Sequence, residues 1–444
     1  MAVIKPFRGV RYNPARFENM QVVVSQPYDR ISDELQQKYY DLSRYNIVRI
    51  IQGKTEAGDT PEGTNVYTRA RDYLHQWMAD GILIREDRPA LYAYEQTFTM
   101  DGKQYVRMGM ITALELADFD EGIVLPHERT HSGPKEDRLR LLSTLQANTE
   151  QIFILYPDPQ NKVNALLRKA IGSRQPDIDV VEIFEDAVRQ RVWVITDPAT
   201  IQAIQAEIAP MRNLIIADGH HRYETGLNYR NAQRQAYPNA PRNAAFNYVA
   251  ATLVSMDDPG LVILPTHREI CNFTETAPAT ILERAKECFT VAPAPDLETC
   301  LTTINAHPNG HAFGFYGGLD LGFYVLTLKS DDLAYSLIEE DHSREWKSLG
   351  VSIAHRILIE RIAGVPQRGI EDKSMIRYHR DPQEAVANVN RGEGNFVFFL
   401  SPTRMAHIKA VAGHGEKMPQ KSTDFYPKVI SGLTLLPLGP DETL

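Results

Sequence analysis

The chain has 444 residues, a formal net charge of −9, and 43% hydrophobic and 24% charged residues, as in ordinary globular proteins. Binding to nucleic acid or to anionic membranes requires a positive field, so this charge argues against both, while a local basic site remains compatible with it. The sequence shows no signal peptide, no apolar run that could span a bilayer and no disulfide or close metal pair among its three cysteines, which predicts a cytoplasmic protein.

Residues 1–88 are expected to form an N-terminal segment. Prolines interrupt its short apolar runs, so residues 1 to about 60 should be irregular, with Gln26-Pro-Tyr-Asp29 as a fixed loop. Apolar residues in 68–80 recur at helical spacing, and Gly81 is placed to end that helix. The spacing predicts one core-facing helix in this segment.

Residues 89–260 are expected to form the core of the protein. The core begins with a hairpin of two strand-like runs across Asp101-Gly102, at residues 90–99 and 104–116. Further strands, separated by helical stretches, are expected at residues 152–156, 180–184, 192–196 and 246–254. This alternation predicts a mixed α/β sheet.

A polar cluster, residues 127–138, follows the apolar run that ends at Pro126, and a helix is expected from there to about Asn148. Two roles suit Glu128: a general base held near a phosphate site, or a carboxylate that caps the helix. Lys135 and Arg138 are likewise candidates for phosphate contacts or for solvated charge.

The segment His127-Glu-Arg-Thr-His131 also matches the zinc-peptidase pattern, in which two histidines one helical turn apart bind the metal. That site needs a helix through both histidines. Pro126 precedes the first one and Gly133-Pro134 closely follows the second, which disfavours such a helix. Metal-dependent hydrolysis is therefore the weakest alternative.

The segment Asn213–Thr225 reads as a buried strand, a tight turn at Asp218-Gly219, and a helix from His220 to about Ala236. The first helical turn would place His220, His221 and Arg222 beside free backbone N–H groups, where phosphates bind well. Ligand sites of α/β sheets form at the carboxyl ends of strands. The simpler alternative is an Asp N-cap and a surface histidine pair.

Residues 261–444 are expected to form a C-terminal α/β domain. Residues 291–308 are rich in proline and should be a weakly ordered excursion, followed by strands at 311–316 and 322–328. A long helix is expected over 344–363 and a strand over 396–400.

The tail segment 416–428 is cationic and rich in hydroxyl groups. Its residues Lys421, Ser422 and Thr423 are typical of a flexible loop that closes over bound phosphates. The simpler alternative is that the segment is only solvated, as lysine-rich tails commonly are. Arg268 and His267, beside the proline-fixed Leu264-Pro-Thr segment, are weaker candidates for binding substrate.

Five ordered motifs resemble the bacterial and archaeal family catalogued as domain of unknown function 1015. They are Leu125-Pro-His-Glu128, Pro134-Lys-Glu-Asp-Arg-Leu139, Ala217-Asp-Gly-His-His-Arg-Tyr223, Leu264-Pro-Thr-His-Arg268 and Met418-Pro-Gln-Lys-Ser-Thr423. The resemblance extends over nearly the whole chain.

Two of these motifs also resemble free-serine kinases of the ParB and sulfiredoxin-like fold, which implies a nucleotide-binding core of that type with a mixed sheet. The resemblance implies that Glu128, preceded by His127, takes the proton of a serine hydroxyl. It also implies that Asp218 binds Mg²⁺ and that Gly219, His220 and Arg222 hold nucleotide phosphates, with His221 at a variable position. The interval between Glu128 and Asp218 is longer than in those kinases.

The leading hypothesis is a kinase that uses ATP and Mg²⁺ to phosphorylate a small hydroxylated metabolite, with serine as first candidate. The kinase requires Glu128 to face the Asp218 turn across one cleft. The second hypothesis is a non-catalytic nucleotide-dependent switch that forms a homodimer when nucleotide binds. Neither hypothesis requires nucleic acid or a membrane as partner.

Overall fold

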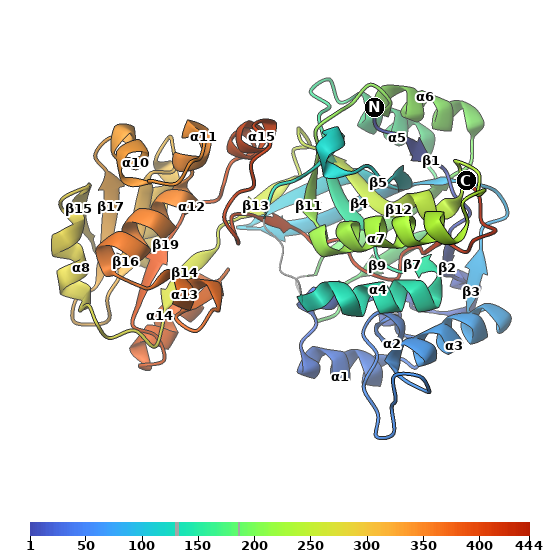
Figure 1. Cartoon of the computed structure of the whole chain (residues 1–444), viewed down its shortest axis with the longest axis horizontal. Helices are drawn as coiled ribbons and strands as arrows, with labels where there is room; N and C mark the ends of the chain where they lie inside the picture. The colour runs from blue at the N-terminus through green and yellow to red at the C-terminus, as the bar shows by residue number, and fades with distance from the viewer. Residues whose placement is uncertain (129–132, 185–186) are drawn as a thin grey trace. The chain divides into compact units, whose positions relative to one another are not determined.

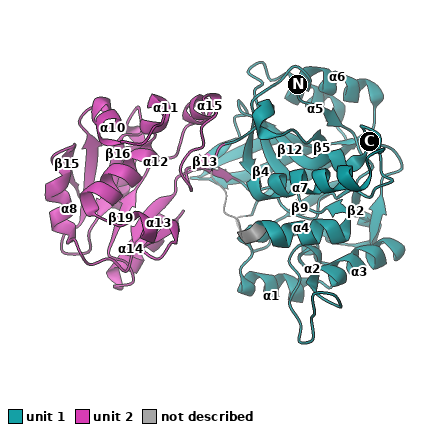
Figure 2. Ribbon diagram, in the orientation of Figure 1, with its two compact units in different colours: residues 1–126, 130–262, 427–444 teal, residues 127–129, 263–426 magenta. Residues whose placement is uncertain are grey.

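The computed structural model describes residues 1–128, 133–184 and 187–444. The chain divides into two compact units, coloured separately in Figure 2. Unit 1 consists of residues 1–126, 130–262 and 427–444, and unit 2 of residues 127–129 and 263–426. The end of the chain therefore returns to the unit in which the chain began.

Unit 1 is built on a nine-stranded mixed sheet, which confirms the expected α/β class (Figure 1). The strand order is β6-β11-β8-β12-β5-β4-β10-β9, and β1 pairs with β5. The pairs β11–β6 and β12–β8 are parallel and the other pairs are antiparallel. The bounds are β1 Ile4–Lys5, β4 Leu91–Met100, β5 Lys103–Glu115, β6 Val124–Pro126, β8 Ile152–Tyr156, β9 Ile178–Val181, β10 Arg189–Ile195, β11 Leu214–Asp218 and β12 Tyr248–Ser255.

Helices cover this sheet, and two pairs of short strands lie beside it. The helices are α1 Asp33–Leu42, α2 Val48–Ile51, α3 Val66–Ala79, α4 Gly133–Leu145, α5 Lys162–Ile171, α6 Pro198–Ile208 and α7 His220–Ala236. The strand pairs are β2 (Val10–Tyr12) with β3 (Leu83–Arg85), and β7 (Ala147–Asn148) with β21 (Leu436–Pro437). Helix α7 contacts β8, β12 and α4, and α4 in turn contacts α3 (Figure 1).

The main core of unit 1 is apolar, and its pattern follows from the sequence. All eight residues of β12 are buried, because this strand lies between β8 and β5 near the middle of the sheet. Side chains of β8 and β11 meet those of α5, α6 and α7 in one cluster. A second cluster joins α2 and α3 to Leu141 and Leu145 of α4. The predicted helix over 68–80 is thus confirmed as core-facing.

Unit 2 is built on a six-stranded antiparallel sheet with the order β15-β17-β16-β19-β14-β18. Its strands are β14 His267–Ile270, β15 Phe289–Ala294, β16 Ala312–Tyr316, β17 Phe323–Leu328, β18 Ile376–His379 and β19 Phe396–Phe399. Its helices are α8 Pro278–Ala285, α9 Leu297–Ala306, α10 Asp331–Leu337, α11 Arg344–Lys347, α12 Gly350–Ile353, α13 Gln367–Glu371, α14 Pro382–Asn390 and α15 Met405–Gly413. The short strands β13 (Val262–Leu264) and β20 (Asp424–Tyr426) pair with each other.

Two segments are more ordered than predicted. Residues 1–60 were expected to be irregular but contain α1. The side chain of Ser32 caps the N-terminus of this helix by accepting a hydrogen bond from the N–H of Leu35. Residues 291–308 were expected to be weakly ordered but contain most of β15 and all of α9. Strand β15 tolerates Pro293 because it is an edge strand that pairs with β17 alone. Both predictions were wrong because polar or proline-rich composition hid the local signals.

The long helix expected over 344–363 is interrupted. After α11 the backbone of Leu349 is extended, with φ −62° and ψ 132°, and α12 begins at Gly350. A Cβ at Gly350 would come within 2.9 Å of the carbonyl oxygen of Gly310, so this close packing excludes a larger residue. The helix then continues over Ala354–Ala363 (η6) with wider, π-helical turns.

Within the part of the chain that is described, no helix combines the length and the apolar character needed to cross a bilayer.

Candidate functional site

The strand-turn-helix segment of unit 1 has the predicted form. Leu214–Ala217 are buried in β11, and α7 has the expected bounds, His220–Ala236. Gly219 links them with φ +90°, a left-handed conformation that favours glycine. No side chain caps the N-terminus of α7, so its first-turn N–H groups are not satisfied by a capping residue.

Asp218 lies between two cations of unit 1. Its Oδ2 accepts a hydrogen bond from Nη2 of Arg222 at 2.8 Å, and Nζ of Lys428 lies 3.2 Å from Oδ1. Only 21% of the Asp218 side chain, 10% of Arg222 and 12% of Lys428 are exposed. Burial opposes ionisation of Asp218, but Lys428 and Arg222 outweigh burial and hold its pKa well below its usual value.

Long-range hydrogen bonds hold Lys428 in this position. Its carbonyl oxygen accepts from Nε2 of Gln96 at 2.8 Å. The fully buried Arg107 donates to the preceding carbonyl, that of Pro427, at 2.6 Å and also bonds to Gln96. The returning C-terminal segment is therefore fixed to β4 and β5 at the point where Lys428 reaches Asp218.

Three further side chains of this cluster were not predicted. Asp29 and Tyr28 come from the loop after Pro27, and Glu150 precedes β8. Carboxylates of Asp29 and Glu150 raise the pKa of Arg222, together with Asp218, although burial opposes this. Desolvation by the surrounding protein raises the pKa of Asp29. The negative charge of Asp218 raises it further, whereas the positive charge of Arg222 lowers it. Burial raises the pKa of Tyr28 to about 12.

Glu150 ties two distant segments to the cluster. Its Oε1 accepts from the backbone N–H of Tyr28 at 3.0 Å and from the hydroxyl of Ser431 at 3.1 Å. The only sequence signal for this set was the proline-fixed Tyr28-Asp29 loop. Glu150 and Lys428 stand in no recognisable motif, so their roles depend on the fold.

A small pocket of about 40 Å³ lies between α4 and α7, and Arg138, Glu150, Arg222 and Thr225 are among its lining residues. Nε of Arg222 and Oγ1 of Thr225 are buried and have no hydrogen-bond partner among the described residues.

The other predicted phosphate-binding residues of unit 1 lie on α4 and α7. Arg138 donates to the carbonyl of Ile51 at 2.7 Å and lies 4.3 Å from the ring centre of Tyr28. Lys135 pairs with Glu224 at 2.5 Å. His220 and His221 are half-buried in the first turn of α7, and His220 helps to lower the pKa of Asp218.

Glu128 and His127 belong to unit 2, where both contact Thr423. Oε1 of Glu128 accepts from the N–H of Thr423 at 3.1 Å and from its hydroxyl at 3.0 Å. Nε2 of His127 lies 2.6 Å from the same hydroxyl oxygen. Thr423, predicted to bind phosphate, thus directs both of its donors at Glu128.

The remaining predicted residues surround the same loop, residues 418–423. Lys421 is exposed with φ +56°, and its carbonyl accepts from Nη2 of Arg268 at 2.8 Å. Ser422 is buried, and its hydroxyl donates to the carbonyl of Pro419.

Arg268 and His267, predicted to bind substrate, are buried. Burial lowers the pKa of Arg268 to about 10, so its guanidinium stays charged at neutral pH, and lowers the pKa of His267 to about 3, so that ring is neutral. Nδ1 of His267 accepts from the N–H of Leu400 at 3.3 Å.

The backbone does not support the zinc-peptidase interpretation. His127 and Glu128 are not helical, and Glu128 forms a parallel bridge with Met418. His131, the other ligand of that pattern, lies outside the described residues. Among the residues that are described, no three Asp, Glu, His or Cys side chains gather as a metal site would require.

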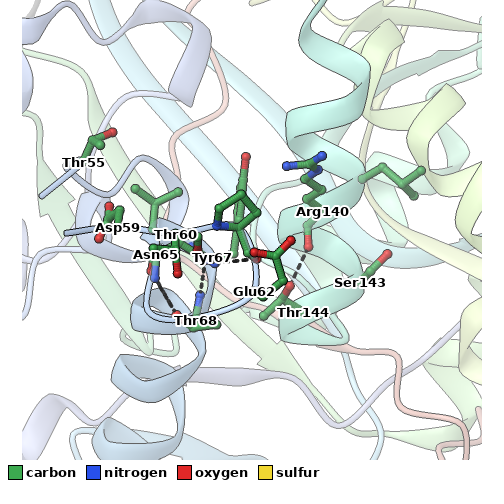
Figure 3. A pocket seen from close by; sticks show the side chains of 13 residues that line it. Thr55, Asp59, Thr60, Glu62, Asn65, Tyr67, Thr68, Arg140, Ser143 and Thr144 are labelled. Atoms are coloured by element: carbon green, nitrogen blue, oxygen red, sulfur yellow. Dashed lines mark hydrogen bonds between the residues drawn. The ribbon is translucent and has the colours of Figure 1, made fainter. Parts of the chain in front are cut away.

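A separate pocket of about 760 Å³ lies in unit 1 between residues 55–68 and α4 (Figure 3). Several of its polar side chains bond within the protein. The hydroxyl of Tyr67 donates to Asp137 at 2.8 Å, and that of Thr144 to the carbonyl of Arg140 at 2.8 Å. The residues that line it differ from those predicted for catalysis or phosphate binding.

Comparison with solved structures finds distant likenesses. A conserved hypothetical protein from Pyrococcus furiosus is 12% identical, with a TM-score of 0.34, over 76% of this chain and 97% of the other. A free serine kinase in complex with AMP is 13% identical, with a TM-score of 0.35, over 76% and 93%. A C-terminally truncated SbnI from Staphylococcus aureus is 10% identical, with a TM-score of 0.34, over 74% and 87%.

Among curated proteins nothing matches the chain. The sequence profile of one family, described as "Protein of unknown function (DUF1015)", matches residues 4–352. This match covers most of the chain and includes four of the five motifs; the fifth, residues 418–423, lies beyond the matched range. The chain belongs to the DUF1015 family.

Proposed function

We propose that the protein is a kinase that transfers the γ-phosphate of ATP to the hydroxyl of a small metabolite, with free L-serine as the first candidate. The observation that carries the proposal is the network of Asp218, Arg222 and Lys428 at the start of α7. Two cations converge there beside helix N–H groups that no side chain caps, a combination that favours bound phosphate. The motif resemblance to free-serine kinases supports the same assignment.

In the proposed reaction the substrate hydroxyl loses its proton to the carboxylate of Glu128. The hydroxyl oxygen forms a bond to the γ-phosphorus, the bond from that phosphorus to the bridging oxygen breaks, and ADP leaves. Such a transfer needs positioning, a proton acceptor and cations around the phosphoryl group more than covalent catalysis. In unit 1 Arg222 and Lys428 are the proposed cations; in unit 2 the exposed Lys421 is a further candidate.

Asp218 does not fit the role of a direct Mg²⁺ ligand. Arg222 occupies one of its carboxylate oxygens and Lys428 the other, so a metal ion bound there would compete with two cations. In this proposal Mg²⁺ enters only as the ion that accompanies ATP in solution, and no step is assigned to it.

The experiment combines calorimetric titration of the full chain with ATP, ADP and AMP and a coupled assay of ADP release with free amino acids. We expect nucleotide binding, and turnover that depends on serine or a related hydroxyl compound. Glu128→Gln should lose at least about 100-fold in kcat with its nucleotide affinity retained. The control is Glu298→Gln, an exposed glutamate of unit 2, which should behave as wild type.

Two results would overturn parts of this proposal. Unchanged turnover in Glu128→Gln would remove Glu128 as the proton acceptor. Nucleotide binding without any phosphorylated product, accompanied by nucleotide-dependent dimerisation in sedimentation velocity, would favour the switch hypothesis in place of the kinase.

A further inference from the structure

Thr423 makes two hydrogen bonds to the carboxylate of Glu128. The N–H of Thr423 and its hydroxyl, at 3.1 and 3.0 Å, both reach Oε1 of the carboxylate. Two donors from one residue on the same oxygen restrict the rotation of the carboxylate as well as its position. The contact joins positions that are 295 residues apart in the chain, so it depends on how unit 2 folds.

The direction of these bonds can be assigned. An ionised carboxylate only accepts hydrogen bonds, so the Thr423 hydroxyl must donate its proton to Glu128. The hydroxyl oxygen then has only lone pairs to offer to Nε2 of His127, 2.6 Å away. His127 must therefore carry a proton on Nε2 and donate to Thr423. The result is a directed chain from His127 through Thr423 to Glu128.

The backbone around this chain is fixed on both sides. The N–H of Met418 donates to the carbonyl of His127 at 2.7 Å. The carbonyl of Ser422 accepts from the hydroxyl of Thr403 at 2.6 Å. The ring of His127 is buried and meets that of Phe425 edge to face, with centroids 5.8 Å apart. These contacts fix the positions from which Thr423 directs its two donors.

We propose that Thr423 is a positioning residue that fixes the orientation of the Glu128 carboxylate, and that His127 in turn fixes the Thr423 hydroxyl. This inference rests on the proposed function, because it matters for catalysis only if Glu128 accepts the substrate proton. It replaces the expectation that Thr423 contacts phosphate. A base that is held in its productive geometry accelerates proton transfer without tightening the binding of either substrate.

The test uses two variants of Thr423 in the full chain. Thr423→Val keeps the shape and the backbone N–H but removes the hydroxyl, and Thr423→Ser keeps the hydroxyl. We expect Thr423→Val to lower kcat by about 10- to 100-fold, the range typical of residues that orient a reacting group, with KM and nucleotide Kd within about twofold of wild type. Thr423→Ser should restore most of the lost kcat.

The matched control is Thr303→Val on α9 of the same unit, where the hydroxyl donates to the carbonyl of Thr299. It should leave kcat unchanged. Thermal melting of each variant excludes loss of folded protein as the cause.

The outcomes separate this inference from the kinase proposal. Absence of turnover in wild type overturns both. Wild-type turnover that Thr423→Val leaves intact, or that Thr423→Ser fails to restore, overturns the positioning role alone. Weaker nucleotide binding by Thr423→Val with a normal kcat would indicate that Thr423 contacts phosphate, and this result would also overturn the positioning role.

Discussion

Arg222 donates from Nη2 to Oδ2 of Asp218 at 2.8 Å, and this pair, four residues apart, connects the last residue of β11 to the first turn of α7. The pair brackets the left-handed turn at Gly219, so its geometry depends on the turn. Lys428 completes the network from the far end of the chain.

Replacing Arg222 with Met should destabilise unit 1 and weaken nucleotide binding. Removal of one partner from a largely buried pair costs about 3 kcal/mol, because the other charge stays desolvated. We expect a loss of about this size in the free energy of unfolding, and at least about 10-fold weaker ATP binding at temperatures where the variant is folded. Denaturant titration and calorimetry measure the two effects.

Arg234→Met serves as the control for this change, since Arg234 lies in the last turn of the same helix and bonds to Asn247 at 2.8 Å. It should leave ATP affinity unchanged. Equal losses of affinity in both variants would show that Arg222 acts only through helix stability.

Stability should fall in acid partly because of Asp218. Burial favours its neutral form, but Lys428 and Arg222 hold its pKa well below the value near 3.9 of an unfolded chain. Its contribution is therefore complete above about pH 5 and is lost as the pH falls through 3.9 towards the folded-state pKa, by at most about 1.4 kcal/mol per pH unit. Asp218→Asn should flatten the fall in unfolding free energy between about pH 5 and pH 3.

The pKa of Asp29 is shifted in the opposite direction to that of Asp218, so the two residues should affect acid stability in opposite ways. Desolvation by the surrounding protein and the charge of Asp218 raise the pKa of Asp29, so the folded state binds a proton at a pH where the unfolded state does not. This uptake stabilises the fold as the pH falls, and Asp29→Asn should make the acid loss steeper. If the unfolding free energies of Asp218→Asn and Asp29→Asn changed with pH in the same way between about pH 5 and pH 3, the opposite pKa shifts assigned to these two residues would be contradicted.

Gly219→Ala should disturb the turn and the cation beside it. The backbone there has φ +90°, and an added Cβ would lie 3.1 Å from the guanidinium of Arg222. We expect a cost of about 1–3 kcal/mol in unfolding free energy, and weaker nucleotide binding because Arg222 must move. Gly413→Ala on α15, where nothing lies within 4 Å of the added Cβ, should cause neither effect. Normal ATP affinity in Gly219→Ala would argue against a phosphate site at this turn.

Glu269 of β14 is a buried carboxylate of unit 2, and we expect its role to be structural. It is fully buried and accepts from Arg377, His379 and Asn388 at 2.9, 2.7 and 2.7 Å. Glu269→Gln places an amide donor against these donors and should cost about 3 kcal/mol. The ATP affinity of the folded variant should not change. Calorimetric titration below the melting temperature measures this affinity. A specific loss of ATP binding would mean that the carboxylate belongs to a ligand site.

Local patterns in the sequence were sufficient for the elements that carry the cluster in unit 1. A short apolar run, Asp218-Gly219 and a polar helix start predicted β11, the turn and the bounds of α7, because strand burial and glycine conformation are local properties. Two runs rich in aromatic and branched residues, joined across Asp101-Gly102, likewise predicted the β4–β5 hairpin. The predictions failed for α1 and for residues 291–308, where a capping serine and an edge strand matter more than average composition.

The sequence by itself therefore determined the mixed α/β class, the family, and the segments in which charged side chains are concentrated. Only the tertiary structure decided which charges meet. Asp29, Glu150 and Lys428 join Asp218 and Arg222 from positions far apart in the chain, and Thr423 reaches Glu128 from 295 residues away. Hydrogen bonds and ion pairs act over a few ångströms in space, so spacing along the chain cannot reveal partners that folding alone brings together.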